Sequence, residues 1–282
     1  MNRFPVRVLP IAIALIVVAY QFVSTPKVRN PETGRVTHVA LNPQQEQQLG
    51  LQAYQQVLSK SEVVSSGPVV DAIQRVARRL AGAASEKSRQ QYNWQLSVVR
   101  SNEVNAFCLP GGEIVVYTGI LPVSQNAAGL ATVMGHEMAH ATSHHGAARL
   151  FKQNVTQTLM SGAQFSFWNM DYQQQQAAMA ALGAFTKYGV SLPFSREDES
   201  EADHIGLLYM ARAGYDPHHA VEFWQRMTQQ AGGSQPPEFA SDHPSHGRRV
   251  EQLQEWMPEA MKEYDAAREK VPESEQTASF SR

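Results

Sequence analysis

The sequence of 282 residues contains a single cysteine, Cys108. One thiol excludes an internal disulfide, and it also excludes any zinc site built from several thiolates. A metal ion in this protein therefore has to be bound by histidines and carboxylates. The sequence also lacks an excess of positive charge, because 24 basic residues stand against 26 acidic ones and the formal net charge is -2. Proteins that bind nucleic acid usually carry a basic patch or stripe, so we expect no nucleic-acid partner.

Apolar runs of membrane-spanning length are scarce as well, and the one candidate lies near the N-terminus. The 19 residues from Val8 to Pro26 carry no charge, and Arg3 and Arg7 precede them. This length is at the lower end of what a bilayer-spanning helix needs, and N-terminal arginines are typical of a cytoplasmic flank. Since no clear cleavage site follows, we interpret residues 1–26 as an uncleaved membrane anchor, with a signal segment as the alternative.

The rest of the chain predicts an α+β fold that is mostly helical. Residues 27–41 are expected to form a linker, and helices are expected from Asn42-Pro43 and from about Val69, where apolar residues recur at helical spacing. Between Trp94 and Leu121 the pattern changes to alternation and a β-branched run, which is typical of strand, turn and strand. Helical periodicity returns over 126–149 and 196–213. We predict one domain over 42–262 and a disordered polar tail over 263–282.

One of these helices contains His136-Glu137-Met138-Ala139-His140, an HExxH pattern. Residues four apart lie one turn apart on the same helix face, so His136 and His140 can both bind one metal ion. Glu137 lies beside that face, where it can reach a metal-bound water without being a ligand. The alternative is a surface helix with incidental histidines, and the apolar character of the remaining helix argues against it.

A catalytic zinc ion usually has three protein ligands and an open position for water, so a third ligand is needed. The metzincin pattern would place a histidine ten residues after His136, but that position is Gly146. A carboxylate from a second helix is the alternative, and Glu199 and Asp203 share one helix face. One of them can bind zinc while the other accepts a hydrogen bond from the outer nitrogen of a ligand histidine. Glu201 is expected to point elsewhere.

Four ordered motifs between about residues 100 and 250 resemble the M48 family of zinc metallopeptidases, in particular its Oma1-like bacterial members with a single anchor. The motifs cover residues 105–119, 135–140 and 195–203, and the segment His243-Pro244-Ser245-His246 with Arg248. The resemblance implies a gluzincin-like zincin domain, with a small β-sheet edging the active-site cleft. No second apolar run of spanning length exists, so family members with several transmembrane helices are a poor match.

The resemblance also implies a role for each site residue. His136, His140 and Glu199 are expected to bind one Zn²⁺ per chain, and Glu137 is expected to be the general base. Asp203 is expected to be the partner of a zinc-bound histidine.

Two further features of the site follow from the same resemblance. In some family members a histidine of the late His-Pro motif approaches the zinc ion, where it either assists the transition state or occupies the open position. His243 is the better match for this histidine, and His246 is the alternative. The strand near Asn105 and Ala106 is expected to bind substrate, since an extended polypeptide can add to a strand at the edge of a sheet.

The resemblance implies a zinc metalloendopeptidase that hydrolyses internal bonds of unfolded or misassembled proteins in envelope quality control. We expect it in the bacterial inner membrane, with the catalytic domain in the periplasm or another extracytoplasmic space. Zinc lowers the pKa of its bound water to about 7, and Glu137 accepts the proton and returns it to the leaving amine. The alternatives are a chaperone or assembly factor with a structural or self-inhibited zinc site, and a zinc hydrolase acting on other bonds or at chain ends.

Overall fold

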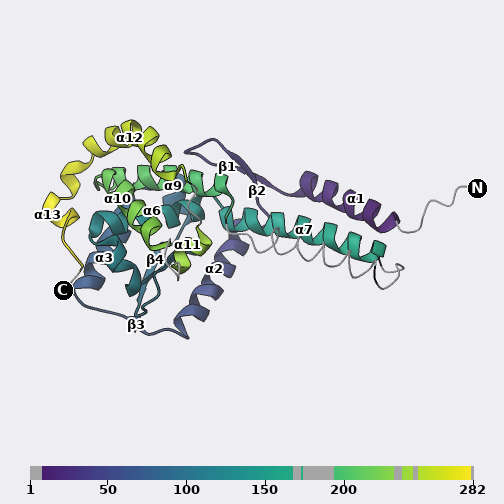
Figure 1. Cartoon of the computed structure of the whole chain (residues 1–282), viewed down its shortest axis with the longest axis horizontal. Helices are drawn as coiled ribbons and strands as arrows, with labels where there is room; N and C mark the ends of the chain where they lie inside the picture. Colours follow the sequence, from purple (N-terminus) through teal and green to yellow (C-terminus); the bar gives the residue numbers. More distant parts are fainter. Residues whose placement is uncertain (1–7, 168–172, 174–193, 232–236, 244–246, 281–282) are drawn as a thin grey trace, which may run out of the picture. The chain divides into compact units, whose positions relative to one another are not determined.

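The protein is described from a computed structural model of the chain, covering residues 8–167, 173, 194–231, 237–243 and 247–280. The chain divides into two compact units. Unit 1 comprises residues 1–29, 35–41 and 146–193, and unit 2 comprises residues 30–34, 42–145 and 194–282. Helices dominate both units and the sheets are small, which confirms the predicted α+β class (Figure 1).

Unit 1 contains helix α1 (Leu9–Ser24), most of helix α7 (His145–Phe167) and a ribbon of strands β1 (Lys27–Arg29) and β2 (Val36–His38). The expected linker over 27–41 thus includes a paired ribbon. Helix α1 has 16 residues, which gives a length of about 24 Å against roughly 30 Å for a hydrocarbon core. No helix within the described ranges is both long enough and apolar enough to span a membrane. The predicted transmembrane anchor is therefore not supported.

Unit 2 contains a four-stranded sheet with the strand order β3-β4-β6-β5. Strand β3 (Val63–Val64) pairs antiparallel with β4 (Gln95–Val99), and β4 pairs in parallel with β6 (Glu113–Tyr117). Strand β5 (Ala106–Cys108) pairs antiparallel with the other side of β6 and forms an edge of the sheet. Strand β6 contains the β-branched run from which a strand was predicted. It lies between β4 and β5, and the run is buried.

Helix α6 (Ala127–Thr142) lies in the core of unit 2, and every one of its residues is buried. Helix α6 packs against α3 (Pro68–Ala83), α9 (Arg196–Arg212), α10 (His218–Ala231) and strand β5. The other helical elements are α2 (Pro43–Leu58), α4 (Glu86–Gln91), η1 (Thr118–Ile120), α5 (Leu121–Ser124), α11 (Glu238–Asp242), α12 (Arg249–Asp265), η2 (Arg268–Lys270) and α13 (Glu273–Gln276).

Side-chain caps fix the starts of α6 and α9, the two helices that contain the predicted metal ligands. The Asn126 side chain accepts a hydrogen bond from the Gly129 main-chain N–H at 2.8 Å, and α6 begins at the next residue. Ser195 and Asp198 form a reciprocal capping box at the start of α9. Such caps satisfy N–H groups that the first helical turn leaves without an intrahelical partner.

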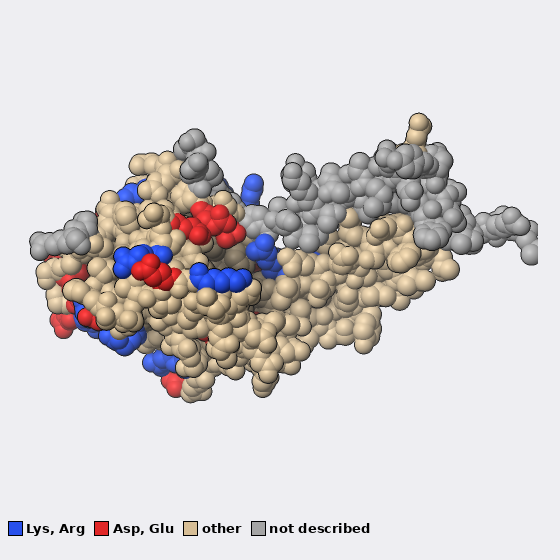
Figure 2. Space-filling model, turned by 90° about the horizontal axis from the view of Figure 1, so that it is seen from below, with Lys and Arg blue, Asp and Glu red and all other residues tan. Residues whose placement is uncertain are grey.

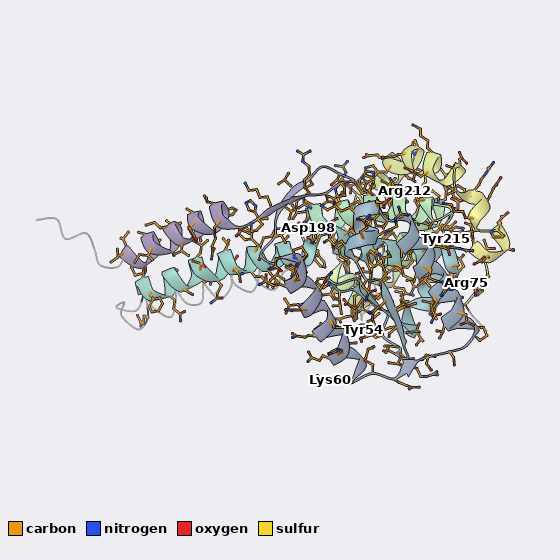
Figure 3. All side chains as sticks on the ribbon, turned by 180° about the vertical axis from the view of Figure 1, so that it is seen from behind. Tyr54, Lys60, Arg75, Asp198, Arg212 and Tyr215 are labelled. Atoms are coloured by element: carbon orange, nitrogen blue, oxygen red, sulfur yellow. The ribbon has the colours of Figure 1, made fainter. Side chains whose placement is uncertain are left out.

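The segment expected to be a disordered tail is 263–282, and its described part, 263–280, packs against other parts of unit 2. Gln276 is 3% exposed, its amide oxygen accepts the Asp216 N–H at 2.8 Å, and its amide nitrogen donates to the Val271 carbonyl at 3.0 Å. Glu275 forms ion pairs with Arg75 and Arg79, the first of which Figure 3 labels. A polar composition suggests disorder, but here polar side chains satisfy buried main-chain groups.

Basic and acidic side chains lie in mixed groups on the face drawn in Figure 2. The described part of this face therefore carries no extended field of one sign, which agrees with the formal net charge of -2.

Candidate metal centre

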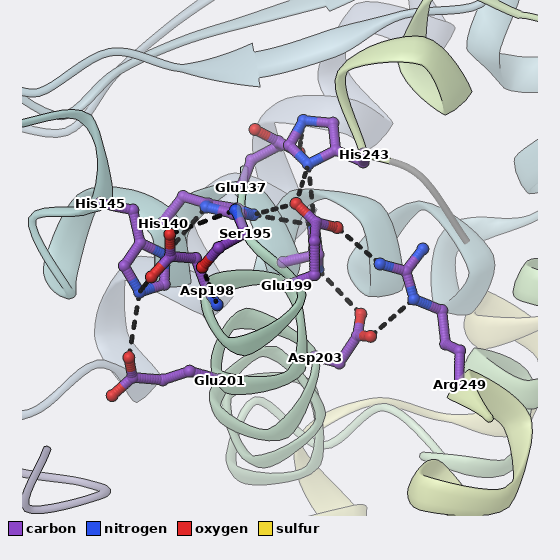
Figure 4. Close-up of polar contacts among 11 residues, drawn as sticks. Glu137, His140, His145, Ser195, Asp198, Glu199, Glu201, Asp203, His243 and Arg249 are labelled. Atoms are coloured by element: carbon purple, nitrogen blue, oxygen red, sulfur yellow. Dashed lines mark hydrogen bonds and ion pairs between the residues drawn. The ribbon is translucent and has the colours of Figure 1, made fainter. Parts of the chain in front are cut away.

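Helices α6 and α9 bring the predicted ligands together. The Nε2 atoms of His136 and His140 lie 3.1 Å apart, and the Glu199 carboxylate oxygens lie 3.5 Å and 3.4 Å from them. His243, at the residue after α11, places its Nδ1 3.0 Å from Glu199 and 3.2 Å from His136 Nε2 (Figure 4). All four side chains are buried. The structure thus brings together the three expected ligands and the expected histidine of the His-Pro motif.

The donor set fits a tetrahedral zinc ion. One atom from each of these four residues lies within 4.8 Å of the others. His136 Nε2 lies 3.1 Å from His140 Nε2 and 3.2 Å from His243 Nδ1, and the contacts of the three histidines with the Glu199 oxygens measure 3.0 to 3.5 Å. Ligands about 2.0–2.1 Å from a tetrahedral zinc ion are about 3.3 Å from one another. Two imidazole Nε2 atoms that face each other in a buried site need a cation or a shared proton between them.

A buried arginine joins two carboxylates behind the ligands. His136 Nδ1 lies 2.9 Å from Asp203, as expected for the partner of a ligand histidine. Arg249 donates from Nε to Asp203 at 2.6 Å and from Nη2 to Glu199 at 2.5 Å. Its guanidinium lies 3.8 Å from the centroid of the Trp224 ring. Arg249 therefore orients the predicted ligand Glu199. It also orients Asp203, the carboxylate that contacts the predicted ligand His136.

Burial and charge set the protonation of the predicted ligands. Burial opposes a charge on His136, but hydrogen bonds and charges of Asp203 and Glu199 outweigh it and raise its pKa to about 9. Burial lowers the pKa of His140 well below its ordinary value, although Glu199 opposes this shift. Burial also opposes a charge on Glu199, but hydrogen bonds from His136, His140 and His243 hold its pKa far below its ordinary value. The metal-free site thus holds a carboxylate, a neutral imidazole and one proton that a metal ion can displace.

Glu137 faces the ligand group without belonging to it. It is 3% exposed, and its Oε1 has no hydrogen-bond partner but lies 3.4 Å from His243 Nε2. Burial raises its pKa, while the charges of His243 and His136 and a hydrogen bond from the Cys108 main chain oppose this shift. A buried carboxylate with a raised pKa beside a metal site has the properties of a general base.

Aromatic rings hold His243 in place. Its ring stacks on Phe239 with centroids 4.6 Å apart and on Phe194 with centroids 5.5 Å apart. Phe194 also lies 4.2 Å from the His140 ring. His246, the alternative to His243, lies outside the described residues.

Strand β5 packs against α6, the helix that carries His136 and His140. The Asn105 carbonyl accepts the Tyr117 N–H, and the Leu109 N–H donates to the Glu113 carbonyl, so both residues are bound to β6. Main-chain groups alternate in direction along a strand, so Ala106 and Cys108 present theirs to the opposite edge. The Cys108 main chain donates to Glu137 there.

The sequence interpretation did not identify three of the polar residues around the ligands. Arg248, which was included in the motif, is 72% exposed, and the buried arginine is its neighbour Arg249. His145 and Glu201 were not expected near the metal, but His145 Nδ1 lies 2.9 Å from His140 Nδ1 and its Nε2 lies 3.0 Å from Glu201. A helical pattern cannot show these contacts, since they cross between helices and turns.

Comparisons with known proteins agree with this geometry. The family model described as Peptidase family M48 matches residues 70–257. The mitochondrial metalloendopeptidase OMA1 of Schizosaccharomyces pombe is 34% identical over 219 residues, which is 76% of this chain and 62% of the relative. Human OMA1 is 36% identical over 177 residues, 61% of this chain and 34% of the relative. The beta-barrel assembly-enhancing protease of Escherichia coli is 28% identical over 218 residues, 76% of this chain and 44% of the relative.

The chain thus spans between about a third and about two thirds of the length of these relatives. The match over 70–257 includes both candidate ligand helices and the His-Pro segment.

Proposed function

The chain belongs to peptidase family M48, and from this we propose that it is a zinc-dependent metalloendopeptidase acting on unfolded or misassembled polypeptides. The observation that carries the proposal is the buried group of His136, His140, Glu199 and His243 with Glu137 beside it. A metal site that is only structural has no need of a buried carboxylate next to its ligands. Such a carboxylate is what hydrolysis by a metal-activated water requires.

We assign His136, His140 and Glu199 as the zinc ligands. Both histidines offer Nε2, since the Nδ1 atom of each contacts another buried side chain. Asp203 holds the His136 ring from behind, which leaves the His136 Nε2 lone pair toward the metal. A bound zinc ion would supply a Lewis acid for the scissile carbonyl and activate a water molecule.

Glu137 accepts the proton of the attacking water and returns it to the leaving amine. Its free Oε1 is on the side of the ligand group, and the hydrogen bond from the Cys108 main chain fixes the carboxylate. Because burial raises its pKa, Glu137 holds the proton more readily than an exposed glutamate would.

The substrate binds as an added strand along β5. Ala106 and Cys108 direct main-chain groups away from β6, so an extended polypeptide can form ladder hydrogen bonds with this edge. Of these two residues, Cys108 already donates its main-chain hydrogen bond to Glu137. We therefore assign the ladder hydrogen bonds with the substrate to the main chain of Ala106. Asn105 acts by shaping this edge, since its amide bonds Glu103 and its carbonyl bonds the sheet.

His243 favours a second candidate, a zinc site that is largely self-inhibited. Its Nδ1 lies among the ligand atoms and its Nε2 lies 3.4 Å from Glu137, so the ring occupies the space that water and substrate need. In the active protein the ring has to withdraw, and it can then assist the transition state from beside the zinc. In an assembly factor it would stay in place.

The cellular location is a separate part of the proposal. We propose that α1, whose exposed side chains are largely apolar, associates the protein with a bacterial inner membrane, with residues 42–262 as an extracytoplasmic peptidase domain. Support comes from the name of the E. coli relative, which refers to β-barrel assembly. Vesicle flotation of the full chain and of a chain lacking residues 1–26 tests the membrane part, because only the full chain should float.

The first experiment measures zinc content and cleavage of casein, for the full chain and for Glu137→Gln. About one zinc ion per chain in both proteins, with cleavage by the unmodified protein alone, is the expected result. Zinc in both proteins without any cleavage favours the self-inhibited candidate. Absence of zinc from both proteins contradicts the assignment of the site.

A further inference from the structure

A series of hydrogen-bonded polar side chains extends from His140 away from the metal centre. His145 is fully buried, its Nδ1 lies 2.9 Å from His140 Nδ1, and its Nε2 lies 3.0 Å from Glu201 Oε2 (Figure 4). The second carboxylate oxygen of Glu201 accepts a hydrogen bond from the Thr33 hydroxyl. None of these three residues is among the predicted ligands or the general base.

The tautomers along this series of side chains are determined by which nitrogen of His140 binds the metal. If His140 binds zinc through Nε2, its Nδ1 carries the hydrogen and is a donor. His145 Nδ1 then has to accept, so the hydrogen of the neutral His145 ring is on Nε2. That N–H points at Glu201, which as a carboxylate only accepts. Every contact from His140 to Glu201 thus pairs one donor with one acceptor.

Thr33, at the far end of this series of side chains, belongs to an ordered turn of unit 2. Asn30 Oδ1 accepts the main-chain N–H groups of Glu32 and Thr33, and its amide nitrogen donates to Ser143 at 2.8 Å. Glu32 forms an ion pair with Arg212 of α9. Thr33 therefore reaches Glu201 from a turn that is tied both to α9 and to the end of α6.

We propose that His145 and Glu201 are positioning residues of the metal site, which set the tautomer and ring orientation of His140. The two ligand histidines are then held differently, His136 directly by Asp203 and His140 through an interposed imidazole. Outer partners of this kind raise the basicity of a metal-bound histidine and limit its rotation. The inference rests on the proposed zinc site.

The test compares the zinc affinity of purified full-length variants, measured by competition with a chelator of known affinity. His145→Phe keeps a ring but removes both nitrogens, and Glu201→Gln keeps the shape but removes the carboxylate. We expect His145→Phe to bind zinc about 10–100-fold more weakly and Glu201→Gln to lose affinity by a smaller factor. Both should also shift the visible bands of the cobalt-substituted protein, which a merely structural role would not move.

His144→Asn is the matched control. His144 is also a buried histidine paired with a buried glutamate, Glu46, at 2.7 Å, and it adjoins His145 in the chain. Its backbone φ is 55°, a value that asparagine tolerates. We expect this variant to keep the zinc affinity and the cobalt spectrum of the unmodified protein.

Unchanged zinc affinity and cobalt spectrum in a folded His145→Phe protein would overturn the proposal. If that variant does not fold, Glu201→Gln decides the matter by the same two readouts. Because no substrate is used, the outcome is separate from the peptidase assignment. An unmodified protein that binds zinc but cleaves nothing would contradict the assigned activity and leave this inference standing.

Discussion

A β-carbon on Gly206 of α9 would lie 2.7 Å from the main-chain nitrogen of His136 on α6. On the other helix, a β-carbon on Gly135 would lie 2.9 Å from the Gly206 carbonyl oxygen. The two helices therefore touch backbone to backbone, one residue before the first predicted ligand. This close approach brings Glu199 to within 3.5 Å of His136. The spacing of the ligand group depends on two glycines that bind nothing.

We expect Gly206→Ala to weaken zinc binding and to lower the free energy of unfolding by about 1–3 kcal/mol, because backbone atoms have to move apart. Gly82→Ala, in α3, is the control. A β-carbon there meets nothing within 4 Å, so alanine should leave zinc affinity unchanged and not destabilise the protein. Chelator competition and urea unfolding of both variants measure the effects. Wild-type zinc affinity in Gly206→Ala would show that the helix spacing does not set the site.

Arg249 is expected to contribute more to the free energy of unfolding of the metal-free protein than to that of the zinc-loaded protein. Its substitution by methionine leaves Glu199 and Asp203 buried without the guanidinium that bonds both of them, and breaking a buried pair of this kind costs about 3–5 kcal/mol. A bound zinc ion restores part of the lost positive charge. Urea unfolding with and without zinc should therefore show a smaller loss in the loaded protein.

The neighbouring Arg248 supplies the control for this comparison. It is 72% exposed and pairs with Glu251 and Glu255 at the surface, so Arg248→Met should change the free energy of unfolding by less than about 0.5 kcal/mol. Equal losses for the two arginines would contradict the role assigned to Arg249.

The sequence was informative wherever a residue's role depends on its own helix. His136 and His140 are one turn apart on α6, so their shared face followed from spacing alone. Glu199 and Asp203 are also one turn apart on α9, so spacing predicted that one would face the metal and the other a ligand histidine, and the M48 resemblance then assigned the second role to Asp203. The M48 resemblance is confirmed by the match over residues 70–257.

The sequence was uninformative where a role depends on contacts between elements. Glu201 does point away from the face of Glu199, as expected, but there it meets His145 and the turn that carries Thr33. Nothing in the pattern of α9 indicates which side chains lie on that side. The choice between Arg248 and Arg249 fails for the same reason, since it depends on where α12 begins and which face it turns to α9.

We expect His243→Ala to increase cleavage of unfolded protein several-fold while reducing zinc retention only slightly. The ring lies among the ligand atoms and beside Glu137, so its removal opens the position that water needs, while three ligands remain. His218→Ala, which changes a histidine 59% exposed outside the site, is the control. Initial rates on casein and zinc content measure both effects. Cleavage that falls at full zinc content would instead assign the ring to the transition state.

The proton on His136 predicts opposite pH dependences for two measurements. Its pKa of about 9 in the metal-free fold lies above the ordinary histidine value of about 6.5. The resulting stability is fully present below about pH 6.5 and is lost as the pH rises through 9, so the metal-free unfolding temperature should fall over this window. Zinc has to displace the same proton, so its affinity should rise by about tenfold per pH unit between pH 7 and 9.

Asp203→Asn separates this explanation from a general effect of alkaline pH. Asparagine removes the charge that, with Glu199, raises the pKa of His136, so the proton should leave at lower pH. Zinc affinity in the variant should then level off well below pH 9, and the metal-free unfolding temperature should depend less on pH. If both proteins show the same slopes, the displaced proton does not belong to His136. Replacing the carboxylate behind His136 by an uncharged amide also weakens zinc binding, so the pH at which affinity levels off is the deciding quantity.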